Sequence, residues 1–238
     1  MSTHAMGGGR AQATAVRTGI SVHWLWLAGG YALAFLVPFV LADRIGLGRD
    51  LYYGLYAVAV AAFFVSWTRS TQQSLGALVR RRWPLAVGLG LLVAAVLSVL
   101  VLRSEDATAR PDGLELAGAL LWRGVVYGAT DGLLLSAFPI LAVFAAFAGS
   151  RLRTSLPGTF LVGVVAMAAS VAMAAVYHAG YAEFRSEKVA KPVAGDVAWS
   201  LPTLVTLNPL GAPIAHVGLH VSAVLHSYET DVFLPPHE

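Results

Sequence analysis

Long apolar runs alternate along the chain with short polar segments, and each run has about the length of a membrane crossing. The runs cover residues 22–42, 51–67, 83–102, 114–148, 157–177 and 201–226. Because a bilayer requires every backbone polar group to be paired, this pattern predicts an all-α, polytopic transmembrane helix bundle with about six crossings. The run at 114–148 exceeds one crossing, and Gly128, Gly132 and Pro139 predict a partly submerged or broken helix within it.

The charges in the polar segments predict how the bundle is oriented. Arg10 and Arg17 precede the first run, and three consecutive arginines at 80–82 precede the third. Cytoplasmic loops are enriched in Lys and Arg, so we expect the N-terminal segment and the loops at 68–82 and 149–156 in the cytoplasm. Six crossings then place both termini on the cytoplasmic side.

The composition agrees with a single membrane domain. The chain is 57% hydrophobic and 12% charged, whereas a soluble domain carries about 25% charged residues. The lipid bilayer is therefore its predicted partner, and the cell membrane its predicted location. The basic residues lie in short loops, so the net charge of +3 does not indicate a nucleic-acid partner. The predicted parts are a disordered cytoplasmic tail, one transmembrane domain and a short C-terminal tail, at residues 1–20, 21–228 and 229–238.

Ionisable side chains interrupt three of the apolar runs and predict a site within the membrane. His216 and His220 are four residues apart, so they share one face of a helix. His178 ends the fifth run, and Arg123 lies inside the fourth. Such residues are rare in membrane segments and by default indicate function. The absence of cysteine excludes disulfides, thiolate catalysis and Cys-ligated metals.

Three short stretches carry these four residues. They are ALLWRGVVYG, AAVYHAGY and PIAHVGLHVSAVL, at residues 119–128, 174–181 and 213–225. Their order, spacing and apolar setting resemble the CAAX-processing and bacteriocin-processing (CPBP) family of intramembrane proteases, over roughly residues 114–226. The resemblance implies hydrolysis of a membrane-associated peptide or protein. It also implies that a glutamate and a first histidine activate water, while a second histidine and an Asn stabilise the oxyanion.

The chain departs from the family pattern at the acidic and amide positions. The paired glutamates of the family fall at Gly118 and Ala119, and its Asn falls at His220. Glu115 precedes the missing pair on the same predicted helix, about 5 Å away along its axis. We therefore favour Glu115 over Asp131 as the acid. The predicted catalytic set is His178, His216, His220, Glu115 and Arg123.

Other functions stay open at this point. The missing glutamates favour a catalytically inactive family member that acts as a membrane scaffold or immunity protein. A third hypothesis is a membrane protein with His-ligated haem or metal, because neutral imidazole is a good ligand. Zinc is the cofactor considered, with His178, His216 and His220 as candidate ligands and water in the fourth position. Ser136 has no evident histidine partner in the sequence, so no serine protease is predicted.

Overall fold

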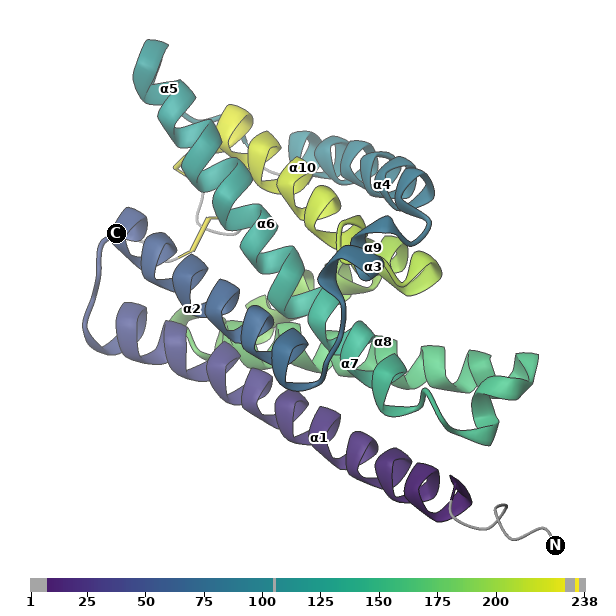
Figure 1. The fold of residues 1–238 in the computed structure, drawn as a ribbon. Coiled ribbons are helices and arrows are strands. Elements are labelled where there is room, and N and C mark those ends of the chain that lie inside the picture. Colours follow the sequence, from purple (N-terminus) through teal and green to yellow (C-terminus); the bar gives the residue numbers. More distant parts are fainter. Residues whose placement is uncertain (1–7, 105, 230–233, 236–238) are drawn as a thin grey trace, which may run out of the picture.

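The fold is helical throughout the described part of the chain. The computed structural model describes residues 8–104, 106–229 and 234–235. Every regular element within these ranges is a helix, which confirms the predicted all-α class (Figure 1). Short helices occupy the connections between the long ones: α3 (Leu75–Arg80), η4 (Arg151–Thr154), η5 (Ala182–Phe184) and η6 (Glu187–Val189).

Within the described part of the chain, five helices are long and apolar enough to cross a membrane, and they indicate a multi-pass membrane protein. Their spans are the end of α1 (Gly8–Val37) with η1 (Pro38–Arg44), α2 (Arg49–Ser70), α4 (Trp83–Ser104), the helix at 113–146, and α8 (Leu156–Ala179). These spans correspond to the first five apolar runs. The helix α1 includes residues 8–20 of the segment expected to be a disordered tail, whereas residues 1–7 lie outside the described residues.

The sixth apolar run is divided between two shorter helices, α9 (Ala190–Thr206) and α10 (Gly211–His226). The helix α9 begins upstream of the run and ends where Leu207 adopts a left-handed conformation with φ of 52°. Asn208 holds the turn, because its side-chain amide donates to the carbonyls of Val79 and Arg81 at 2.7 and 2.6 Å. Asparagine at this break therefore joins the α9–α10 turn to the α3–α4 connection.

The fourth run forms one continuous helix, Gly113–Ala146, which we call the central helix. It consists of α5 (Gly113–Ala119), η2 (Leu120–Val126), α6 (Tyr127–Asp131), η3 (Gly132–Ala137) and α7 (Phe138–Ala146). The irregularity expected here takes the form of two π-helical stretches, η2 and η3, rather than a break. Its most apolar stretch is 83% buried, more than in any other candidate span, so this helix is the axis of the bundle.

The other helices pack around the central helix in two groups (Figure 1). On one side, α1, α2 and α8 enclose the main apolar core, which contains Trp67, Phe138 and Tyr177. On the other side, α10 lies between the central helix and α4, with α9 against them, and Leu97, Trp199 and Leu219 form a smaller core. The candidate site lies between these two groups.

Glycines let α10 lie very close to the central helix. A Cβ added at Gly128 would lie 3.0 Å from the carbonyl oxygen of His216, and one at Gly132 would lie 2.5 Å from the Cα of Pro213. Small residues at a four-residue spacing are typical of close helix pairs in membranes. This approach places the histidine-bearing turn of α10 directly against Asp131, the last residue of α6.

Candidate functional site

A cavity of about 480 Å³ lies where α4, the central helix, α8, α9 and α10 meet. Its wall is largely apolar, with side chains such as Leu97, Val101 and Leu219. The ionisable and hydroxyl side chains in the wall are Ser104, Tyr127, Asp131, His178, Lys191, His216 and His220. A mostly apolar pocket with a few convergent polar groups is the usual form of a ligand or active site.

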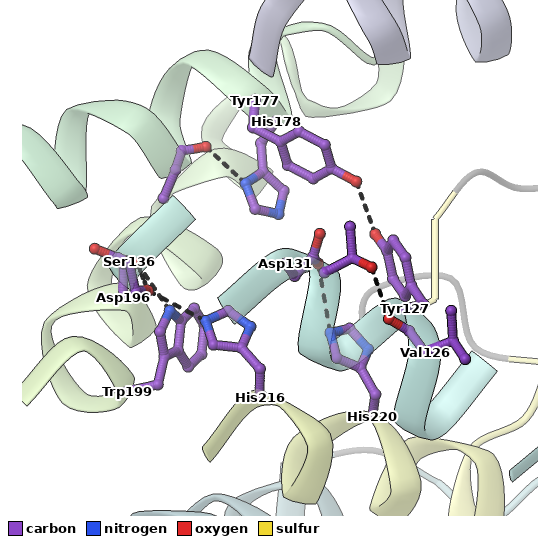
Figure 2. A network of polar contacts seen from close by, with 12 residues as sticks. Val126, Tyr127, Asp131, Ser136, Tyr177, His178, Asp196, Trp199, His216 and His220 are labelled. Carbon is purple, nitrogen blue, oxygen red and sulfur yellow. Dashed lines mark hydrogen bonds and ion pairs between the residues drawn. The ribbon is translucent and has the colours of Figure 1, made fainter. Parts of the chain in front are cut away.

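Asp131, His216 and His220 form a compact cluster in the wall of this cavity. One ligating atom from each residue lies within 4.8 Å of the other two, and all three side chains are buried. Nε2 of His220 lies 3.5 Å from Oδ2 of Asp131 (Figure 2). The cluster thus brings together one carboxylate from the central helix and two imidazoles from α10.

A buried hydrogen-bond chain orients His216. The hydroxyl of Ser136 donates to Oδ1 of Asp196 at 3.0 Å, so its oxygen accepts from Nε2–H of His216 at 3.3 Å. Asp196 also accepts from Ser170 and from the indole N–H of Trp199. Since a neutral imidazole carries one proton, the Nδ1 atom of His216 bears a lone pair. Figure 2 shows Nδ1 on the side of the ring that faces His220 and Asp131.

Three polar atoms of the cluster have no hydrogen-bond partner among the described residues. They are Oδ1 of Asp131 and the Nδ1 atoms of His216 and His220. A buried polar group without a partner costs about 1–3 kcal/mol. Because buried polar groups are nearly always paired in proteins, this concentration at one place indicates a site for a ligand.

His178 enters the same cavity from the end of α8. Its Nδ1–H donates to the carbonyl of Ala174 at 2.7 Å, which leaves the lone pair on Nε2. The ring packs edge-on against Tyr177 and Phe184, so its orientation is fixed from two sides. The backbone carbonyl and the packing therefore give His178 the tautomer that a general base requires.

A network of tyrosine hydroxyls borders the site. Tyr127, whose side chain lines the cavity, shares a 2.9 Å hydrogen bond with Tyr177. Tyr177 is 2.8 Å from Tyr181, which donates to Tyr52 at 2.7 Å. The ring of Tyr127 also packs edge-on against His220, with centroids 4.8 Å apart. These contacts fix the α2 and α8 side of the cavity with respect to the histidines on α10.

The structure brings together three of the five residues predicted as catalytic. His178, His216 and His220 all line the cavity. Neither Arg123 nor Glu115 is among the residues that line it, and their catalytic roles stay predictions. Arg123 instead binds Asp50 at the start of α2 through two hydrogen bonds of 2.9 and 2.8 Å.

Asp131, and not the favoured Glu115, is the acid in the wall of the cavity. Glu115 is exposed near the start of the central helix, and a Cβ at Gly118 would contact nothing within 4 Å. Of the two positions that match the missing family glutamates, Gly118 faces open space, whereas Ala119 is buried against Ala223 and Val224 of α10, about one turn beyond His220. The signal for Asp131 was present in the sequence, since a carboxylate inside an apolar helix usually marks a site.

Sequence reasoning missed the residues that support the site. Ser136 has a histidine partner after all, but its proton points to Asp196, so the three do not form a nucleophilic triad. Asp196 lies between two apolar runs in the sequence, and the structure buries it completely on α9. Asp50 gave no signal because a charge at the first turn of a helix is ordinary.

Comparison with known proteins adds no relative. No protein-family model, no curated protein and no solved structure matches the chain. The functional argument therefore depends on the geometry of the cavity and the chemistry of its side chains, and similarity to the CPBP family stays a prediction from short sequence stretches.

Proposed function

We propose that this protein is an intramembrane hydrolase of the CPBP type that cleaves a membrane-associated peptide. The observation that supports this proposal is the convergence of Asp131 with His178, His216 and His220 in one largely apolar cavity. Amide hydrolysis needs a base for water and fixed groups that stabilise the developing charge. In this chain Asp131 supplies the carboxylate that the family pattern places on the absent glutamates.

The proposed reaction begins with a water molecule beside His178. Nε2 of His178 removes one proton, and the resulting hydroxide attacks the carbonyl carbon of the scissile amide. The protonated imidazole, whose charge the Asp131 carboxylate stabilises, then gives its proton to the leaving nitrogen. The carbon–nitrogen bond breaks, and the products are one carboxylic acid and one amine. His178 returns to its neutral form, so the cycle is balanced.

The wall of the cavity indicates the class of substrate. Leu97, Leu100 and Val101 of α4 form an apolar side that suits an apolar segment of a membrane peptide. Exposed Ser104 and Lys191 belong to the wall near the ends of α4 and α9. The predicted topology places both segments outside, so we expect entry from the outer side. A prenylated CAAX protein in the cytoplasm is then not the expected substrate.

A cleavage assay in proteoliposomes tests the proposal. The substrates are peptides with an apolar segment and a polar outer end, and mass spectrometry identifies the products. We expect His178→Ala and Asp131→Asn to lower the cleavage rate about 10²–10⁴-fold, the usual effect of removing an acid–base group. Glu115→Gln is the matched control, because Glu115 is an acid of the same helix outside the cavity.

Two results would contradict the proposal. Cleavage that survives both cavity substitutions would show that the reaction does not use this cavity. Failure of the folded wild-type protein to cleave any peptide in the panel would instead favour the inactive scaffold or immunity protein.

A further inference from the structure

We propose that Asp131, His216 and His220 bind a zinc ion whose remaining coordination position faces the cavity. This inference adds a metal to the site of the proposed function. It differs from the three-histidine set considered from the sequence, because Asp131 replaces His178 among the ligands. The amount of bound zinc is measurable without any assay of cleavage, so the two proposals are tested separately.

The spacing of the three side chains fits a metal ion after a small contraction. Tetrahedral ligands on bonds of about 2.1 Å are about 3.4 Å apart. Nε2 of His220 and Oδ2 of Asp131 are already 3.5 Å apart. The three ligating atoms lie within 4.8 Å of one another, so the largest closure needed is about 1.4 Å. Small rotations of side chains supply such a movement without a change in the backbone.

The distribution of protons in the cluster also favours a cation. His216 presents a lone pair at Nδ1, because its Nε2–H is donated to Ser136. Asp131 offers acceptor oxygens, of which Oδ1 has no partner among the described residues. A deprotonated carboxylate and a neutral imidazole are the forms that bind metals. A zinc ion would therefore satisfy acceptor atoms that have no hydrogen-bond partner among the described residues.

His216 has the supporting contacts of a metal ligand. A metal-bound histidine usually donates its second N–H to a carboxylate, a carbonyl or water, which fixes the tautomer and the ring. Here the Ser136 hydroxyl accepts the N–H of His216 and donates to Asp196. Trp199 and Ser170 also donate to the Asp196 carboxylate and hold it in place. The Trp199 ring packs against the imidazole with centroids 4.7 Å apart. These contacts orient Nδ1 toward the cluster before any ion binds.

The ligand types suit zinc, and non-haem iron(II), which uses the same set, is the competing metal in the test. Two imidazoles and one carboxylate with an open fourth position form the ligand set of many catalytic zinc sites. The chain contains no cysteine, which excludes thiolate sites. His178 lines the same cavity but does not belong to the cluster of ligating atoms. It therefore stays available as the base for a water molecule on the metal.

Metal analysis of the purified protein tests the assignment. The protein is produced in zinc-replete medium with a purification tag that contains no histidine. We expect about one equivalent of zinc per chain, and at least a tenfold loss in His216→Ala, in His220→Ala and in Asp131→Asn. His226→Asn is the matched control, because His226 lies on the same helix outside the cavity wall. His178→Ala should also keep its zinc.

Several results would overturn the proposal. Less than about a tenth of an equivalent of zinc per chain in the wild-type protein would refute the proposed zinc site. Zinc lost equally from His178→Ala and His220→Ala would replace this ligand set with the three-histidine set. Zinc kept by His216→Ala and His220→Ala would show binding elsewhere on the protein. Iron in place of zinc, or a visible haem spectrum, would also contradict it.

Cobalt substitution covers the case in which a ligand variant does not fold. The wild-type protein is stripped with a chelator and loaded with Co²⁺, whose visible absorption reports coordination number and ligand type. A four-coordinate nitrogen and oxygen spectrum is expected, and a spectrum of hydrated cobalt would contradict the site. A protein that binds zinc but cleaves no peptide would contradict only the proposed hydrolase activity. Cleavage by protein that is isolated without zinc would contradict only the proposed metal site.

Discussion

Gly132→Ala should disturb the geometry of the candidate site by displacing the backbone of α10, without changing any polar side chain. The added Cβ would lie 2.5 Å from the Cα of Pro213, whereas carbon atoms in contact are about 3.5–4.0 Å apart. The helix α10 must then move outward by about 1–1.5 Å at this point. Overpacking of this kind costs about 1–3 kcal/mol of folding free energy. The same movement separates the histidines of α10 from Asp131.

The effect on the site follows from the distance between His220 and Asp131. That distance is 3.5 Å, and an increase of about 1 Å places the two atoms too far apart to share a metal ion. We expect a lower unfolding temperature, reduced zinc content and a loss of cleavage rate of about 10²-fold, typical of a 1 Å misplacement. Thermal unfolding in detergent, metal analysis and the peptide assay measure these three effects.

Gly118→Ala is the matched control for this substitution. It adds the same methyl group to the same helix, but nothing lies within 4 Å of the new Cβ. Alanine favours a helix by up to about 1 kcal/mol over glycine, so this variant should be at least as stable as the wild type. If Gly132→Ala matched Gly118→Ala in unfolding temperature, the close contact between α10 and the central helix would be refuted.

Three further predictions concern other parts of the structure. Ser136→Ala should weaken zinc about 10–100-fold in a chelator competition, since His216 loses the acceptor that orients it; unchanged affinity would deny that role. Arg123→Lys should cost about 0.5–1 kcal/mol in unfolding free energy while cleavage persists, because it weakens the pair with the half-exposed Asp50 and the contact with the Tyr228 ring, both outside the cavity wall; abolished cleavage in folded protein would support a catalytic role for Arg123. Gln73→Cys, in a chain without cysteine, should react with an impermeant reagent only after cells are opened, and labelling of intact cells would contradict the topology.

Much of the architecture could be predicted from the apolar pattern alone. The first five runs coincide with the five candidate spans, because bilayer thickness fixes the length of a crossing helix. The histidine pair on α10 was also predictable, since residues four apart share a helix face whatever the neighbouring helices are. His178 lies in the same cavity as this pair because it is near the end of α8, which packs on α9.

The sequence marks Asp131 as a candidate, but the choice between Asp131 and Glu115 could not be made from it, because that choice depends on which helix faces which. On a straight helix Asp131 lies about 80° around the axis from Arg123, so the two residues meet different neighbours. Arg123 contacts α2 through Asp50, whereas Asp131 contacts α10 through His220. The glycines that bring α10 to this face are visible in the sequence, but their partner helix is not. Family spacing counted from Arg123 therefore indicated Glu115.

The departures from the CPBP pattern gain a common explanation if the zinc proposal is correct. An Asn stabilises an oxyanion by donating a hydrogen bond, whereas the imidazole at His220 also ligates. His216 already donates its one proton to Ser136, so a neutral cluster has little to offer a developing negative charge. A zinc ion held by Asp131 and both histidines would stabilise that charge and lower the pKa of its bound water to about 7. Under the two proposals together, Asp131 would supply the carboxylate that is absent at Gly118 and Ala119, and the zinc ion would stabilise the charge that an amide stabilises in the CPBP pattern.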